Sequence, residues 1–381
     1  MAPTLPPTPK PFVLPPPPGR ASFSRAGSSK NSLVRPIAIT MGDPAGIGPE
    51  IIAKAFRDAP DVTAGCFVAG DVATMRRAAG FISAGQIPLP VACIDAPAEA
   101  QGLPPRCLPV LQITEHTAPV PIGEISGLAG EMAAQCVVWA AKAALRGDVA
   151  ALVTAPLHKE ALALAAGPHS AFPGHTEMLQ ALAASHLGKP VADLPVRMML
   201  ANGELRVVLV SIHMALIDAI KAVTVGNVLQ TLRIAHNSLG AVLGRAPQIG
   251  VAGLNPHAGE GGLFGREEID IIAPAIAAAR REGIAAHGPF APDTVFMRAR
   301  ATACKPGEFD VVAAMYHDQG LIPVKYLGVE KGVNVTLGLP LVRTSPDHGT
   351  AFDIAGQGVA DAASLIEAIR MARSLVDTRA P

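Results

Sequence analysis

The sequence predicts an α/β fold with a mixed sheet, and three observations support this class. From residue 36 onward, short apolar runs alternate with longer helical patterns, as in sheets covered by helices. Hydrophobic residues make up 50% of the chain and aromatic residues 4%, a composition typical of buried parallel strands built from small aliphatic side chains. A hairpin pattern around Asn202 interrupts the alternation, so we expect antiparallel strands in the middle of the sheet.

The elements follow in order along the chain. We expect strands at 37–40, 66–69, 150–153, 249–252 and 311–315, helices at 48–59 and 72–79, and long helices at 123–145 and 225–243. A helical pattern also begins near Arg266. The runs 197–201 and 204–210 flank Asn202-Gly203, a pair that suits a type I′ turn.

Composition limits the classes of function. Lys plus Arg and Asp plus Glu number 31 each, so no bulk charge favours nucleic acid or an anionic membrane. No apolar run reaches the about 18 residues of a membrane-spanning helix. The five cysteines form no C-x-x-C pair, which predicts reduced thiols in a cytoplasmic protein.

Residues 1–34 differ from the rest of the chain. They are rich in Pro and Ser, and no acidic residue precedes Asp43. Proline prevents the amphipathic helix of an organelle signal, and an apolar signal-peptide core is absent from the segment. We expect a disordered tail outside the fold, or a segment that results from an upstream start codon.

Five of the apolar runs end in loops that carry His, Asp, Lys or Gly, at 41–50, 154–159, 211–213, 253–265 and 316–320. Each loop alone is equally well explained as a capped turn. Because ligands bind outside the carboxyl ends of strands in α/β sheets, the five loops together predict one site.

Three histidines closely follow strand-like runs: His213, His257 and His317. Neutral imidazoles from separate loops bind a divalent transition metal and leave positions open for substrate. Ligands so far apart in sequence have no diagnostic spacing, and the alternative is three structural histidines.

Other segments suggest contacts with an anion. Phe172–Glu177 precede an apolar-periodic stretch, so His175 and Thr176 are predicted at a helix N-terminus that favours phosphate or carboxylate. The alternative is simple capping by Thr176. Lys325, Asn334 and Arg343 follow in a segment poor in other charges.

The pattern G-x-G-x-x-G does not follow any predicted strand, so a Rossmann dinucleotide fold is not supported. Asp353 lies in a Gly-rich loop, however, where a carboxylate is suited to bind a ribose hydroxyl.

A series of motifs resembles the 4-hydroxythreonine-4-phosphate dehydrogenase family of pyridoxal phosphate biosynthesis, including its 4-phospho-D-threonate and 4-phospho-D-erythronate dehydrogenase relatives. In order they are M-G-D-P-A-G-I-G-P-E, T-A-P-L-H-K, P-G-H-T-E, G-L-N-P-H-A-G-E-G-G, P-D-T-V-F, Y-H-D-Q-G-L-I-P-V-K and G-V-N-V-T-L-G-L-P-L-V-R-T-S-P-D-H-G-T-A. The resemblance implies an isocitrate/isopropylmalate-dehydrogenase-like fold of two α/β/α domains, a homodimer, and a site in the interdomain cleft. We expect one domain at 35–160 plus about 345–381, and the other at 161–344.

The resemblance also implies roles for individual residues. The family's metal ligands fall on His213, His257 and His317, with both subunits contributing to each site. Its substrate contacts fall on His175, Thr176, Lys325, Asn334 and Arg343, and Lys325 either assists proton transfer or pairs with substrate anions. The segment H-G-T-A-F-D-I-A-G is similar to an adenosine-binding loop, so His348, Gly349, Thr350 and Asp353 are the expected cofactor contacts. An Asp at this place favours NAD over NADP.

The reaction that the resemblance implies is oxidation of 4-phosphohydroxy-L-threonine at C3, with NAD and a divalent metal (Zn, Mg, Co or Mn). The β-keto acid product loses CO₂ to give 3-amino-2-oxopropyl phosphate. Relatives act on 4-phospho-D-threonate, 4-phospho-D-erythronate or cyclic cis-diols. A metal-dependent hydrolase and a non-catalytic phosphate-binding protein are the alternatives from other classes.

Overall fold

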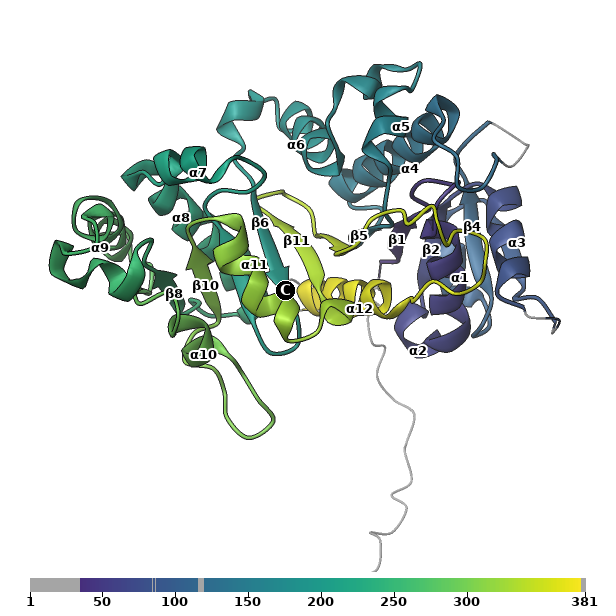
Figure 1. Ribbon diagram of the computed structural model, residues 1–381. Coiled ribbons are helices and arrows are strands. Elements are labelled where there is room, and N and C mark those ends of the chain that lie inside the picture. Colours follow the sequence, from purple (N-terminus) through teal and green to yellow (C-terminus); the bar gives the residue numbers. More distant parts are fainter. Residues whose placement is uncertain (1–34, 84, 86, 116–119, 378–381) are drawn as a thin grey trace, which may run out of the picture. The chain divides into compact units, whose positions relative to one another are not determined.

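A computed structural model describes residues 35–377 apart from 84, 86 and 116–119 (Figure 1). The predicted tail, residues 1–34, lies outside the described residues. Five strands come first: β1 (Ile37–Thr40), β2 (Cys66–Gly70), β3 (Val91–Ile94), β4 (Leu108–Gln112) and β5 (Ala151–Thr154). Between and after them lie α1 (Gly48–Asp58), α2 (Pro60–Thr63), α3 (Val72–Phe81), α4 (Gly127–Arg146), α5 (Lys159–Ala163) and α6 (His175–His186).

Seven strands follow: β6 (Arg197–Ala201), β7 (Arg206–Leu209), β8 (Ile249–Ala252), β9 (Ala286–Phe290), β10 (Val311–Ala314), β11 (Val333–Leu337) and β12 (Arg343–Pro346). The accompanying helices are α7 (Leu216–Ala222), α8 (Val225–Leu243), α9 (Ala273–Arg281), α10 (Val295–Ala299), α11 (His317–Tyr326) and α12 (Ala363–Asp377). None of the helices in the described ranges is both long and apolar enough to cross a membrane.

The strands form one sheet in the order β3-β4-β2-β1-β5-β12-β11-β6-β7-β10-β8-β9. Strands β1 to β5 and β12 run parallel to one another, whereas β11 pairs antiparallel with β12 and with β6, and β6 pairs antiparallel with β7. Strands β10, β8 and β9 then continue parallel to β7. The predicted α/β class with a mixed middle sheet is confirmed. The division into two domains stays a prediction.

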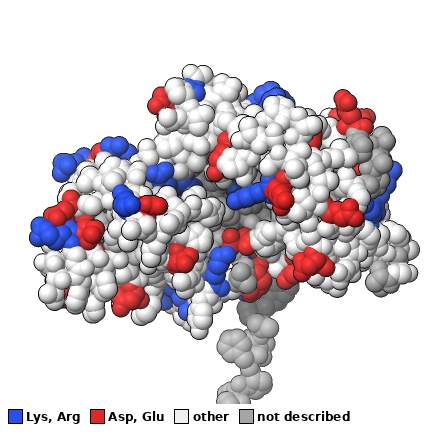
Figure 2. Space-filling model, turned by 45° about the horizontal axis from the view of Figure 1, so that its top comes forward, with Lys and Arg blue, Asp and Glu red and all other residues white. Residues whose placement is uncertain are grey.

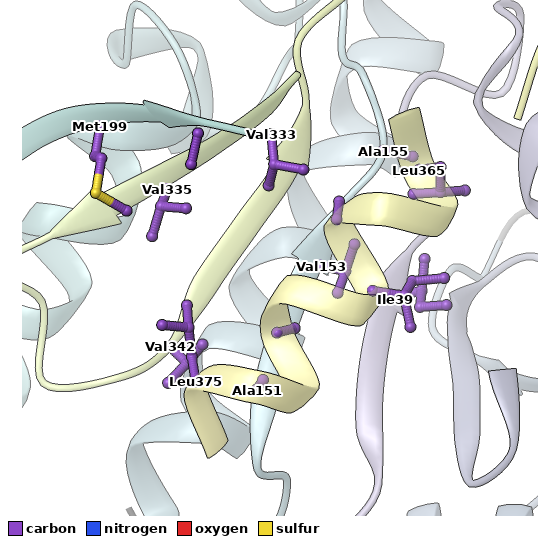
Figure 3. Close-up of a cluster of buried hydrophobic side chains, with 14 of the residues drawn as sticks. Ile39, Ala151, Val153, Ala155, Met199, Val333, Val335, Val342, Leu365 and Leu375 are labelled. Carbon is purple, nitrogen blue, oxygen red and sulfur yellow. The ribbon is translucent and has the colours of Figure 1, made fainter. Parts of the chain in front are cut away.

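Successive residues of a strand point to opposite faces of the sheet. Apolar side chains on both faces pack against helices. Figure 3 shows one apolar face, where Ile39 of β1 and Val153 of β5 pack with Leu365 of α12. On the other face Leu152 of β5 packs in a cluster with Met178 of α6. Over the face of the molecule that Figure 2 presents, basic and acidic side chains are interspersed.

Several predicted bounds agree with the structure, and others differ. The predicted bounds of β1 and α8 are those observed, but α4 begins at Gly127 after the Ser126 N-cap and not at 123. Near Arg266 a short π-helix at Glu268–Ile272 precedes α9.

The prediction of a two-residue type I′ turn in the hairpin was wrong. Ala201 pairs with Arg206, and neither Asn202 nor Gly203 has a positive φ. The Asn202 Oδ1 instead accepts hydrogen bonds from the N–H groups of Glu204 and Leu205, both at 2.9 Å. An Asx turn therefore replaces the backbone geometry that the pair Asn-Gly usually adopts.

Candidate active site

A cavity of about 480 Å³ lies over the central strands of the sheet, within the range typical of small-ligand sites. Its floor is formed by polar residues that alternate with core residues along these strands. In β11, Val333, Val335 and Leu337 face the core, whereas Asn334 and Thr336 line the cavity. Thr154 of β5 and Arg343 and Ser345 of β12 line the same floor.

Loops and a helix end form the walls. They come from the segment after β5, the first turn of α6, the segment after β7 and the segment after β12. The lining residues from these segments include Lys159, Gly174, His175, Thr176, Glu177, His213, Asp347, His348 and Gly349. The cavity therefore collects residues from distant parts of the chain.

Arg343 is a buried cation held by hydroxyl groups. Its side chain is 4% exposed, and its Nε and Nη2 donate to Thr154 Oγ1 at 3.2 and 2.7 Å, while Nη1 donates to Thr336 Oγ1 at 3.1 Å. No salt bridge joins Arg343 to a carboxylate within the described residues. Burial lowers the pKa of its guanidinium to about 10, with Glu177 acting in the opposite direction. An uncompensated buried cation beside a cavity is suited to an anion.

His175 lies next to this guanidinium at the first position of α6. Its Nε2 atom is buried without a hydrogen-bond partner in the part of the chain that the structure describes. Burial, followed by the charges of Arg343 and Lys159, lowers the pKa of His175 well below 6.5. The ring is therefore neutral near pH 7 and has a nitrogen left for a ligand.

The N-terminus of α6 offers further donors to an anion. Gly174 is the N-cap and no side chain caps this end of the helix, so the alternative that Thr176 is the N-cap was wrong. The backbone N–H groups of the first turn have no partner within the helix, and the helix dipole favours negative charge there. Thr176 lines the cavity in this turn.

The structure brings together two of the three predicted metal ligands. The rings of His213 and His317 have centroids 5.6 Å apart. His317 Nδ1 lies 2.7 Å from Asp318 Oδ1, which leaves Nε2 for another ligand. The pKa of His213 is lowered by burial and by the charges of Lys159 and His317, against the influence of Glu177, so its neutral, metal-binding form is favoured.

His257 does not join this pair within one chain. It is exposed in the Gly-rich loop after β8, with a φ of 53° and its Nδ1 3.6 Å from Glu260 Oε2. Within residues 35–377, apart from 84, 86 and 116–119, no group of three or more His, Cys, Asp or Glu side chains is arranged to hold a metal ion.

Lys325 is connected to the cavity through an ion pair with Asp347. Its Nζ forms an ion pair with Asp347 Oδ2 at 2.7 Å, without the alignment of a hydrogen bond. Asp347 lines the cavity, whereas Lys325 is half-exposed beside it. The charge of Lys325 is thus already balanced before any substrate binds.

The predicted cofactor loop follows β12. His348 and Gly349 line the cavity, Thr350 is buried, and Asp353 is exposed. The loop rests on the first motif, because the Ile47 N–H donates to Thr350 O at 2.9 Å and a Cβ at Gly46 would lie 2.8 Å from the same oxygen. Close packing of the two loops requires glycine at position 46.

The expectation that five strand-end loops converge is met only in part. The loops 154–159 and 211–213 line the cavity. The loop 41–50 holds the loop 154–159 by a hydrogen bond, which the Asp43 N–H donates to Pro156 O at 2.9 Å. The loops 253–265 and 316–320 contribute no lining residue. Strand direction does not explain this difference, because β7, whose following loop 211–213 lines the cavity, runs parallel to β10 and β8.

Sequence reasoning assigned no individual role to several polar or charged residues of the cavity, among them Thr154, Lys159, Glu177, Thr336 and Asp347. A signal was available for some of them. Thr336 alternates with apolar residues in Val333–Leu337, and Lys159 ends the predicted loop 154–159.

Comparisons with known proteins agree with this geometry. The family model described as "Pyridoxal phosphate biosynthetic protein PdxA" matches residues 63–372. The chain is 51% identical over 344 residues to a 4-hydroxythreonine-4-phosphate dehydrogenase of Beijerinckia indica subsp. indica, covering 90% of this chain and 96% of the relative. It is 46% identical over 349 residues to a D-threonate 4-phosphate dehydrogenase of Cupriavidus necator, covering 90% and 98%.

Solved structures give the same result. A 4-hydroxythreonine-4-phosphate dehydrogenase from Klebsiella pneumoniae superposes with a TM-score of 0.78 at 41% identity, covering 90% of this chain and 99% of that one. A terephthalate 1,2-cis-dihydrodioldehydrogenase from Burkholderia xenovorans gives 0.60 at 31% identity, covering 89% and 98%. The chain therefore belongs to the PdxA family and is an oxidoreductase of the dehydrogenase type.

Proposed function

We propose that the protein oxidises 4-phosphohydroxy-L-threonine at C3, and that the β-keto acid formed decarboxylates to 3-amino-2-oxopropyl phosphate. The observation that carries the proposal is the buried Arg343, whose charge has no carboxylate partner among the described residues and faces a cavity of small-molecule size. The names of the relatives support a small phosphorylated hydroxy acid as substrate.

The phosphate is assigned to the Arg343 end of the cavity. A guanidinium has five N–H donors, and three of them are used by Thr154 and Thr336. The remaining two provide a fork for phosphate oxygens. His175, Thr176 and the free N–H groups of α6 add donors, and Asn334 contributes its amide from the floor.

NAD and a divalent metal are the proposed cofactors. When bound, NAD supplies the hydride acceptor and the metal (Zn, Mg, Co or Mn) polarises the C3 hydroxyl. His348, Gly349 and Thr350 are assigned to the dinucleotide, and the exposed Asp353 carboxylate suits a ribose hydroxyl while repelling the 2′-phosphate of NADP. Lys325 is assigned to proton transfer or to pairing with a substrate anion.

The metal is proposed to bind between two copies of the chain in a homodimer. His213 and His317 of one copy would provide two imidazoles, and His257 of the other copy the third. The short distance between the first two rings and the exposure of His257 in the loop after β8 support this arrangement.

Mixing variants tests the shared site. A mixture of His213→Ala and His257→Ala proteins, dissociated and reassociated, should regain activity because mixed dimers contain one intact set of ligands. A mixture of His213→Ala and His317→Ala should stay inactive, since every site lacks one ligand from that pair. Equal recovery in both mixtures would contradict the assignment.

The substrate is tested by following NADH formation with NAD⁺ and a divalent metal. We expect the highest kcat/KM with 4-phosphohydroxy-L-threonine. The second candidate is oxidation of D-threonate 4-phosphate, favoured by the 46% identical relative, and a higher kcat/KM with that compound or with D-erythronate 4-phosphate would select it. Release of inorganic phosphate without NADH would instead indicate the hydrolase.

A further inference from the structure

Lys159 is a cation of the cavity without an assigned role. It is the first residue of α5, and its side chain is exposed in the cavity wall. The preceding His158 caps this helix, with Nδ1 accepting from the Ala161 N–H at 3.4 Å, and its ring stacks on Phe352 with centroids 4.9 Å apart. These contacts fix the backbone from which Lys159 extends.

The side chain of Lys159 reaches from α5 to the first turn of α6. Lys159 Cε is 3.7 Å from the position that a Cβ on Gly174 would occupy, beside the first turn of α6. The charge of Lys159 also contributes to the lowered pKa of both His175 and His213. One of these rings lies at the buried Arg343 end, and the other is paired with His317.

Lys159 is free to bind a ligand. No salt bridge joins it to a carboxylate among the described residues. The carboxylate of Glu177 is nearby, with Oε2 3.5 Å from the same Cβ position at Gly174, but it does not form an ion pair with Lys159. Lys325, in contrast, is neutralised by Asp347 at 2.7 Å.

We propose that Lys159 is a further substrate-binding residue and holds the substrate carboxylate, while Arg343 and His175 hold the phosphate. This inference rests on the proposed function, because it requires a substrate with both groups. A phosphate has three terminal oxygens and needs the many donors of the Arg343 end. Because Arg343, His175 and the first turn of α6 supply donors for the phosphate, the unpaired ammonium of Lys159 is left for the second anion of the substrate, its carboxylate.

Binding measured by calorimetry, without NAD⁺, separates the two anions. The probes are D-threonate 4-phosphate, which carries a phosphate and a carboxylate, and glycerol 3-phosphate, which carries the phosphate alone. We expect Lys159→Met to weaken binding of the first probe about tenfold to a hundredfold, the range for a hydrogen bond to a charged group. Binding of the second probe should not change, and Lys159→Arg should retain most of the affinity for the first.

Lys142→Met is the matched control, because Lys142 is exposed on α4 and does not line the cavity. It should bind both probes like the wild type. If Lys159→Met weakens binding of both probes equally, the assignment of Lys159 to the carboxylate is wrong. If the variant binds both probes like the wild type, Lys159 does not contact the substrate. Failure of the wild type to bind either probe would overturn the proposed substrate class itself, a result visible before any variant is measured.

Discussion

Arg343→Met is expected to stabilise the ligand-free protein while it removes phosphate binding. Burial lowers the pKa of Arg343 to about 10, a shift that corresponds to about 3 kcal/mol against the charged form inside the protein. The variant loses the hydrogen bonds to Thr154 and Thr336, at about 1 kcal/mol for each hydroxyl. Water in the cavity can reach both hydroxyls, so the net gain in free energy of unfolding is about 1 kcal/mol.

The assay is urea unfolding at one protein concentration, first in buffer without phosphate. Adding phosphate should then reverse the order of stability. At a phosphate concentration 100 times Kd the wild type gains about 2.7 kcal/mol, whereas the variant gains nothing. Arg370→Met is the control, since Arg370 forms an exposed ion pair with Glu367 on α12, and its loss should leave both results unchanged. An Arg343→Met protein less stable than the wild type by about 1 kcal/mol or more without phosphate would refute the reasoning.

Three further predictions concern the metal, the cofactor and pH. Exhaustive chelation should stop NADH formation, and His213→Ala should lower the metal content measured by elemental analysis; full activity after chelation would exclude the metal role. Asp353→Ala should raise kcat/KM with NADP⁺ relative to NAD⁺, and a wild type equally efficient with both would remove Asp353 from this role. The pKa of His175 is lowered in the folded state. As the pH drops below about 6.5, the unfolded chain therefore binds a proton before the folded protein does. The free energy of unfolding should fall by up to about 1.4 kcal/mol per pH unit in this range. His175→Gln should flatten that slope in unfolding curves measured at several pH values, and an unchanged slope would contradict the buried neutral ring.

Local patterns predicted the elements better than their arrangement. The apolar run at β1 and the helical period of α8 gave both elements their observed bounds, because these signals depend on neighbouring residues. The direction of β8 and β10 relative to β1 is set by the antiparallel pairings of β11 with β12 and β6, and of β6 with β7. The pairing of β11 with β6 joins residues more than 130 positions apart and has no local signal.

For the candidate site, too, the sequence predicted some residues and missed others. His175, Asn334 and Arg343 were predicted and do line one cavity, whereas Lys159 and Glu177 were missed because charged residues next to a helix start resemble a solvated surface. Position in a sequence does not show that the loop after β5 and the first turn of α6 share a wall of the cavity. The role of each residue stays a prediction.

The place of β12 in the sheet also bears on how the chain folds during synthesis. Strands β5 and β11 are made before the strand that lies between them, and α12, whose Leu365 packs on β1 and β5, is made after all of them. Until these last segments leave the ribosome, β5 has an unpaired edge and the apolar face of the first strands is uncovered. Arg343 is the first residue of β12, so the residue proposed to bind the phosphate is also part of the segment that closes the sheet. A nascent chain therefore lacks this arginine until the strand that closes the sheet has been made.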